Sequence, residues 1–338
     1  MKTPSNIKLD SFGEASKSYL LENLAAFSLD RRDFPYEGSG RSIQIASLRG
    51  LCKHIANDLV SGSIEYAKAL ILGWSEISKL SSIKGTKGDV RAIIIGNGPS
   101  QDFIKPDVLQ QFKKSGNDIF VINYWPENTR LSNISPTHFV TSDPYTLCEN
   151  KDQTIPPDIL NSNSKLMNYL MVDTKITIMA PIWQTKYLKN VFGDNRVVGF
   201  VDGETRALSS NIDPRFPRGY VSMTLYKALA IAIHMGYKKI YLIGMDNTYP
   251  RDIFCDSNNN IFRRERHAGG SDSLMNITRL IPSMDVQMQD IFNLFYDLRR
   301  CFDGAKVINL DPYSLTDVFP KAASIGDVDA VLTNPNTL

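Results

Sequence analysis

From residue 90 onward, the chain alternates short apolar runs of strand length with longer, helix-compatible segments. This alternation is typical of a mostly parallel β-sheet with helices on both faces, so the sequence predicts an α/β fold. In such a sheet the carboxyl ends of the strands meet at one edge, where ligands bind. The predicted strands are 91–95, 118–122, 137–141, 175–179, 196–200, 239–243 and 306–309, and the predicted helices are 103–114, 157–168, 183–191, 220–235 and 285–301.

The first predicted strand ends in a glycine-rich turn, Gly96-Asn97-Gly98-Pro99-Ser100. A β-branched run that stops at glycines is typical of a buried strand entering a tight turn. A helix N-terminus after such a turn exposes unpaired N–H groups, so the turn predicts a phosphorylated ligand. It is not a dinucleotide fingerprint, because Gln101 replaces the third glycine, and it is not a Walker loop, because no Gly-Lys-Ser/Thr follows.

Polar residues also follow three other predicted strands. The strand at 118–122 leads to Asn123, and the strand at 239–243 leads to Gly244 and Asp246. The strand at 137–141 leads to Ser142 and Asp143. We expect these residues to share one site with Asn97, although each of them alone is equally typical of a turn or a helix cap.

The chain divides at a Gly- and Lys-rich link, residues 81–89. Residues 1–85 form a predicted helical N-terminal extension, with helix-spaced apolar residues in 15–28 and 43–80. Residues 90–325 form the predicted α/β domain. The extension packs on that domain, forms an oligomer contact or lies on a membrane; the sequence leaves these alternatives open.

Composition excludes several classes of protein. The formal net charge of the 338 residues is +2 and there is no long basic run, so nucleic acid is not indicated as a partner. The four cysteines are far apart, as expected of reduced thiols in a cytoplasmic protein. The N-terminus lacks the apolar core of a signal peptide, and no apolar run reaches the roughly 18 residues of a transmembrane helix.

Two segments carry a family resemblance. The segment Ile93–Ser100 resembles the N-terminal motif of the bacterial sialyltransferases of glycosyltransferase family 42. The segment Ala230–Asp246 resembles their second signature, a helix that runs into Gly-Tyr-Lys and then a strand ending in Gly-x-Asp. The flagellin-modifying nonulosonate transferases, or motility accessory factor group, share a similar core. The resemblance covers residues 90–320, and residues 1–85 have no counterpart in it.

The resemblance implies a Rossmann-like domain, a variant of the GT-A type with a single nucleotide domain. It implies a transferase that needs no metal or further cofactor and takes a CMP-activated nine-carbon acidic sugar as donor. The donor nucleotide would lie across the strand ends, with Gly96, Asn97, Gly98 and Ser100 at its phosphate or ribose, Gly244 and Asp246 at its cytidine and ribose, and Asn123 and Ser142 nearby. Asp143-Pro144 stands where the family has Asn-Pro, and Tyr249 lies near the position of a tyrosine that contacts the leaving phosphate.

Catalysis is assigned to a predicted lid at residues 250–280. His267 suits a general base, because histidine titrates near neutral pH. The family spacing places the base near Leu280 instead, and Asp272 and Asp285 are further alternatives. The cluster Arg263–Arg266 either binds phosphate and carboxylate groups or is a solvated loop. Within it, Arg266 is the residue assigned to catalysis.

The segment before the predicted helix 220–235 supplies further candidates. Arg215 and Arg218 precede this helix, where an arginine beside the helix N-terminus suits an anion. Ser222 and Thr224 are hydroxyl donors or caps in its first turn. The remaining histidines, His54, His138 and His234, are predicted to be structural.

The predicted function is transfer of sialic acid or a related nonulosonate to a bacterial surface glycan (lipooligosaccharide, O-antigen or capsule). The expected partners are the CMP-sugar donor and the glycan acceptor. A homo-oligomer and peripheral attachment to the inner face of the bacterial inner membrane are left open. Two alternative functions remain: a non-catalytic nucleotide-binding or assembly protein, and a Mg²⁺-dependent pterin diphosphokinase-like enzyme with the same core.

Overall fold

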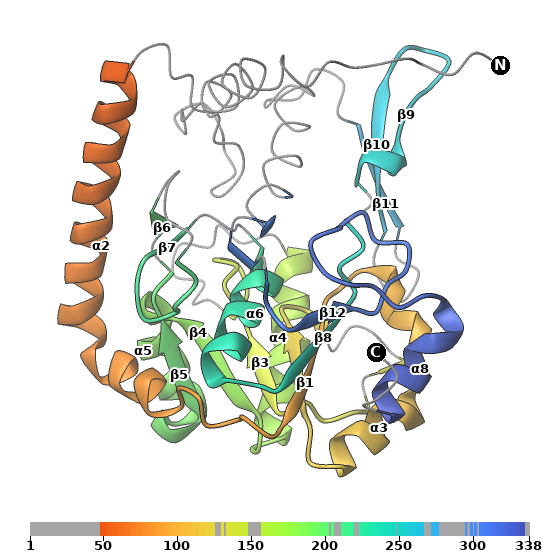
Figure 1. Cartoon of the computed structure of the whole chain (residues 1–338), viewed down its shortest axis with the longest axis horizontal. Coiled ribbons are helices and arrows are strands. Elements are labelled where there is room, and N and C mark those ends of the chain that lie inside the picture. The colour runs from red at the N-terminus through yellow and green to blue at the C-terminus, as the bar shows by residue number, and fades with distance from the viewer. Residues whose placement is uncertain are drawn as a thin grey trace, which may run out of the picture.

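A seven-stranded parallel sheet forms the centre of the computed structural model (Figure 1). The strand order is β12-β8-β1-β2-β3-β4-β5, and every neighbouring pair is parallel. The strands are β1 (Arg91–Ile95), β2 (Asp118–Ile122), β3 (His138–Val140), β4 (Thr177–Pro181), β5 (Val197–Phe200), β8 (Lys239–Ile243) and β12 (Val307–Asn309). Each of the seven predicted strands overlaps one of them, which confirms the α/β class.

The structure describes residues 48–125, 130–131, 133–147, 157–202, 204–205, 211–219, 223–247, 249–266, 272–276, 295, 298–299, 301–302 and 304–334. The predicted helical segment 15–28 and most of the predicted helix 285–301 therefore lie outside the described residues.

Helices cover both faces of the sheet, as predicted. Alternate residues of each strand face opposite sides, so Ile93 and Ile95 pack in one core and Ala92 and Ile94 in the other. The first core also contains α3 (Pro106–Lys114), α4 (Pro157–Val172), α5 (Ile182–Phe192) and α8 (Ile325–Thr333). The second contains α6 (Thr224–Met235) and the end of α2 (Leu48–Ser82).

Two helix boundaries differ from the prediction. The predicted helix 103–114 is divided into a 3₁₀ turn, η2 (Pro99–Phe103), and α3, because Pro106 can begin a helix but cannot continue one. The predicted helix 220–235 begins only at Thr224. Its N-terminus lies beside the carboxyl end of β3, because Thr224 contacts Ser142, which follows that strand.

The long helix α2 confirms the helical prediction for residues 48–80. It bends at Gly73, whose backbone is not helical; a Cβ atom there would meet the Ile182 side chain at 2.6 Å. After the bend, Glu76 is buried against β5 and α5. Its carboxylate accepts a hydrogen bond from Gly199 N at 2.9 Å and forms an ion pair with Lys189.

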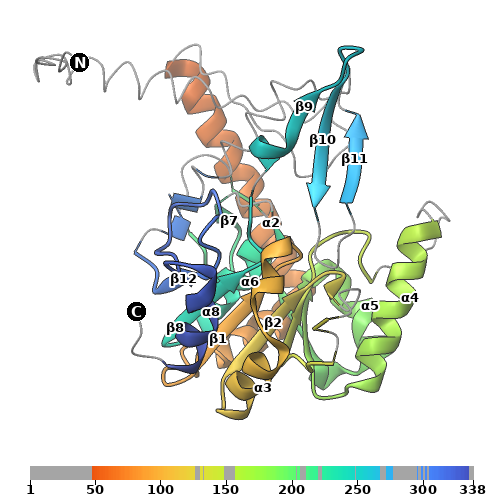
Figure 2. The ribbon, with the colours of Figure 1, turned by 90° about the vertical axis from the view of Figure 1, so that its right-hand side faces the viewer.

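Two small sheets lie beyond the carboxyl edge of the main sheet. The strands β6 (Glu204–Thr205) and β7 (Arg218–Gly219) are parallel, whereas β9 (Ile253–Cys255), β10 (Ile261–Arg266) and β11 (Asp272–Asn276) form an antiparallel sheet that stands away from the domain (Figure 2). The predicted lid at 250–280 is thus a sheet in its described part, rather than a loop. A short 3₁₀ turn, η5 (Tyr249–Asp252), leads into it, and η4 (Asp194–Arg196) precedes β5.

Candidate functional site

The strand order reverses between β1 and β8. The chain leaves β1 through α3, on one face of the sheet, and enters β8 through α6, on the other face. In open α/β sheets, ligands bind outside the carboxyl ends of the strands at such a switch point. The turns that follow β1 and β8 are the two motifs that carry the resemblance, and the fold places them side by side.

Glycine backbones make this contact possible. Gly96 N donates to Ile243 O at 2.8 Å, and Gly98 N donates to Gly244 O at 3.1 Å. A Cβ atom on Gly96 would lie 2.4 Å from Gly244 O, and one on Gly244 would lie 2.4 Å from Gly96 O. These glycines therefore bring the two turns into backbone contact, whereas their contact with a nucleotide remains a prediction.

Ser100 and Asp246 fasten the same two turns together. Ser100 Oγ accepts a hydrogen bond from Gly244 N at 2.9 Å, and Ser100 N donates to Asp246 Oδ1 at 3.1 Å. Ser100 is buried, whereas Asn97 is partly exposed in the turn after β1. The predicted ligand contacts of Ser100, Asn97 and Asp246 remain predictions.

Asp311, which the sequence analysis missed, lies beside Asp246. Burial, reinforced by the nearby Asp311 carboxylate, raises the pKa of Asp246 to about 7, although hydrogen bonds from Ser100 oppose this shift. Burial also raises the pKa of Asp311, against hydrogen bonds that include Tyr313 N at 2.8 Å. The pair therefore retains a proton near neutral pH. Asp311 closely follows the predicted strand 306–309, so the strand-end argument would have found it.

A second polar cluster joins the ends of β2 and β3 to the start of α6. Thr224 Oγ1 accepts a hydrogen bond from Asn123 Nδ2 at 3.3 Å and lies 2.8 Å from Ser142 Oγ. Asn123 has a left-handed backbone (φ 47°), and its Oδ1 is buried without a partner in the described part of the chain. The positive end of the α6 dipole lies at this cluster, an arrangement that favours an anion.

Asp143 also follows β3, and its side chain stabilises a turn. Its Oδ1 accepts a hydrogen bond from Tyr145 N at 2.8 Å. This is an Asx turn, one of the alternatives that the sequence left open. Its contact with a ligand remains a prediction.

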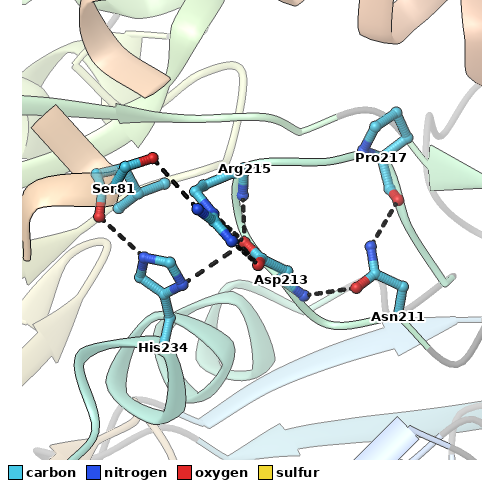
Figure 3. A network of polar contacts seen from close by, with 7 residues as sticks. Ser81, Asn211, Asp213, Arg215, Pro217 and His234 are labelled. Carbon is cyan, nitrogen blue, oxygen red and sulfur yellow. Dashed lines mark hydrogen bonds and ion pairs between the residues drawn. The ribbon is translucent and has the colours of Figure 1, made fainter. Parts of the chain in front are cut away.

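The prediction that Arg215 flanks the N-terminus of α6 is wrong. Arg215 binds Asp213 through Nε and Nη2, at 2.9 and 2.6 Å, and reaches Ser81 Oγ at 3.3 Å (Figure 3). Asp213 in turn lies 3.5 Å from Nδ1 of His234, in the last turn of α6. Arg215 thus links the segment before α6 to the end of α2 by hydrogen bonds. This network lies at the C-terminal end of α6, whereas Thr224 lies at its N-terminal end.

Two of the histidines are structural, as predicted. His234 Nε2 makes a 2.9 Å hydrogen bond with Leu80 O. His138 is buried and stacks on Phe120, with the ring centroids 4.3 Å apart. Burial lowers the pKa of His138 to about 4, so this residue is neutral at physiological pH.

The predicted catalytic and neighbouring site residues fall into two groups. His267, Ser222, Leu280 and Asp285 lie outside the described residues. Arg218, Tyr249, Arg266 and Asp272 lie in β7, η5, β10 and β11, but only their backbone is described. The strand β10 runs back toward the main sheet (Figure 2). Arg266 is its last residue, and its backbone is in register with that of Asp272, the first residue of β11.

Among the described residues, no three His, Cys, Asp or Glu side chains cluster as metal ligands. None of the described helices combines the length and the apolar character that a membrane span requires.

The fold and site define a Rossmann-like α/β protein with polar groups at its switch point. No family model and no curated protein matches the sequence. Among solved structures, the chain is similar to the MAf glycosyltransferase from Magnetospirillum magneticum AMB-1, with 12% sequence identity and a TM-score of 0.38. The match covers 76% of this chain and only 40% of that protein.

Proposed function

We propose that this chain is a glycosyltransferase that moves sialic acid or a related nonulosonate from a CMP-activated donor to a bacterial surface glycan. One observation carries the proposal: Ser100 and Gly244, from the two motifs of the resemblance, are hydrogen-bonded to each other at the switch point of the sheet. Two motifs that are far apart in the sequence therefore form a single surface at the edge where α/β proteins bind nucleotides.

The two polar clusters suit different parts of such a donor. The start of α6, with Thr224 and Ser142, offers hydroxyl groups and the positive end of a helix dipole to a phosphate or carboxylate. The pair Asp246 and Asp311 retains a proton, so one carboxyl can donate a hydrogen bond to a ribose hydroxyl. The shared proton also reduces repulsion between the pair and an anionic nucleotide.

The proposed reaction is a displacement at the anomeric carbon of the donor. The acceptor hydroxyl oxygen forms a bond to this carbon, the bond to the phosphate oxygen breaks, and CMP leaves with the electron pair. The hydroxyl proton passes to a base, for which His267 is the proposed residue. CMP has a single phosphate, so helix N–H groups, arginines and Tyr249 are proposed to stabilise the leaving group without a metal.

Asp246 and Asp311 also support a second candidate, a Mg²⁺-dependent diphosphokinase-like enzyme. Carboxylate oxygens are the ligands that Mg²⁺ prefers in proteins. Mg²⁺ would have to displace the proton that this pair retains, so this candidate predicts metal binding that weakens as the pH falls.

Nucleotide-dependent melting and donor hydrolysis test the proposal. We expect CMP to raise the melting temperature more than UDP, ADP or NAD do, and the protein to hydrolyse CMP-sialic acid in the presence of EDTA. ATP-dependent turnover that requires Mg²⁺ would support the diphosphokinase instead. Absence of any nucleotide effect would indicate a non-catalytic protein.

A further inference from the structure

The loop after β12, residues 311–316, exposes one aromatic ring. The side chains of Asp311, Ser314 and Thr316 are buried, and each of these residues is at most 2% exposed, whereas Tyr313 is 57% exposed. The packing of the loop therefore does not depend on this ring. A tyrosine ring offers a ligand a large contact area at a low cost in conformational entropy.

Hydrogen bonds hold this loop against the turn after β8. Ser314 Oγ donates to Met245 O at 2.7 Å, and Leu315 N donates to Asp246 O at 3.1 Å. The loop is thus fixed to a rigid part of the sheet. Binding residues are commonly placed on loops that a rigid scaffold positions in this way.

Tyr313 also adjoins the carboxyl pair at the switch point. Its backbone N donates to Asp311 Oδ1 at 2.8 Å, and Asp311 lies beside Asp246. The ring therefore begins next to the groups that are proposed to bind the ribose.

The proposed phosphate cluster lies on the other side of this pair. It joins the ends of β2 and β3 to the start of α6, whereas the loop of Tyr313 follows β12, beyond β8 in the sheet. At about 4.8 Å between neighbouring strands, β8 lies about 10–14 Å from β2 and β3. This is roughly the length of an extended nucleoside monophosphate. A nucleotide with its phosphate at α6 and its ribose at Asp246 therefore directs its base toward Tyr313.

We propose that Tyr313 forms the nucleobase subsite of the donor, with the planar base stacked on its ring. This inference rests on the proposed function and adds the residue that holds the base. Stacking is possible with any base, because every base has a π face. Tyr313 therefore supplies affinity for the nucleotide and does not select cytosine over uracil.

A second turn of nearly the same sequence provides a matched control. Residues 143–147 read Asp-Pro-Tyr-Thr-Leu, and residues 311–315 read Asp-Pro-Tyr-Ser-Leu. In the first turn, Asp143 Oδ1 accepts a hydrogen bond from Tyr145 N, also at 2.8 Å. Tyr145 is 50% exposed, but it follows β3, at the phosphate end of the proposed site. A change at Tyr145 should therefore leave the contact with the base intact.

Calorimetric titration of the full-length chain with CMP and with ribose 5-phosphate, which lacks the base, tests the subsite. Tyr313→Ala should weaken CMP binding about tenfold or more, as for the loss of one stacked base, and should leave the affinity for ribose 5-phosphate unchanged. Tyr313→Phe keeps the ring and should retain the wild-type affinity for CMP. Tyr145→Ala should also retain it.

The outcomes separate this inference from the proposed function. A wild-type chain that binds no CMP would contradict both. A wild-type chain that binds CMP, with Tyr313→Ala binding it equally well, would overturn the subsite alone. An equal loss of CMP and ribose 5-phosphate binding in Tyr313→Ala would also overturn it, because the residue would then act through the shape of the loop. A larger loss of CMP binding in Tyr145→Ala than in Tyr313→Ala would place the base at the other turn.

Discussion

Gly244 N donates a 2.9 Å hydrogen bond to Ser100 Oγ, across a separation of 144 residues in the sequence. The same serine donates its backbone N–H to the carboxylate of Asp246. One buried residue therefore holds the turns after β1 and β8 in register. A ligand that binds at the switch point therefore meets a preformed surface. Preorganisation of the surface lowers the entropic cost of binding.

Gly244→Ala tests the close approach of the two turns. Gly244 has a φ of +73°, and its added Cβ would lie 2.4 Å from Gly96 O. We expect the free energy of unfolding to fall by about 3 kcal/mol or more, because strain and a backbone clash add together. Chemical denaturation measures this fall.

Gly304→Ala is the matched control for that change. Gly304 has a φ of +76°, and an added Cβ there meets nothing within 4 Å. Only the backbone cost of about 1–2 kcal/mol should appear. Equal losses in the two variants would show that the added Cβ at Gly244 is accommodated, which would contradict the close approach of the two turns.

The raised pKa of Asp246 predicts a dependence of stability on pH. The folded protein binds this proton up to about pH 7, whereas an unfolded carboxyl loses it near pH 4. The contribution of this residue to stability is therefore complete below about pH 4 and is lost as the pH rises to 7. Asp246→Asn carries a neutral amide at every pH, so the variant should gain stability relative to the wild type over this range. Denaturation at a series of pH values measures the difference, and a constant difference would contradict the prediction.

Thr224→Val tests the anion cluster at the start of α6. The change removes the hydroxyl that contacts Asn123 and Ser142 and keeps the shape of the side chain. We expect CMP affinity to fall about tenfold, as for the loss of one good hydrogen bond. Calorimetric titration with CMP measures the change. Thr333→Val, an exposed position in the last turn of α8, should leave the affinity unchanged.

Arg215→Gln separates the network in Figure 3 from the proposed ligand site. The change removes the paired contact with Asp213 and should lower the free energy of unfolding by about 1 kcal/mol, because the pair is only partly buried. The stabilisation by CMP should remain as in the wild type. A loss of CMP binding at unchanged stability would instead place Arg215 in the ligand site.

The strands of the main sheet could be predicted from the sequence, in three cases with their observed boundaries. Residues 91–95, 118–122 and 239–243 were predicted with the boundaries of β1, β2 and β8, because each is an apolar run that stops at turn residues. The antiparallel strands β9 to β11 were missed. Their residues, such as Arg263 and Arg264, do not alternate between apolar and polar, so only pairing with a neighbouring strand shows that they are extended.

In the candidate site, too, some features could be predicted from the sequence and others appear only in the folded structure. The sequence by itself determined which residues follow the strands, among them Asn123, Ser142 and Asp246, because local patterns mark where a buried strand ends. Tertiary structure alone decided which of them meet. The order of the strands in the sheet pairs Ser100 with Gly244 and brings Asp311 to Asp246, and the course of the chain places Arg215 at the far end of α6. Contacts between segments far apart in the sequence depend on packing, which no local pattern records.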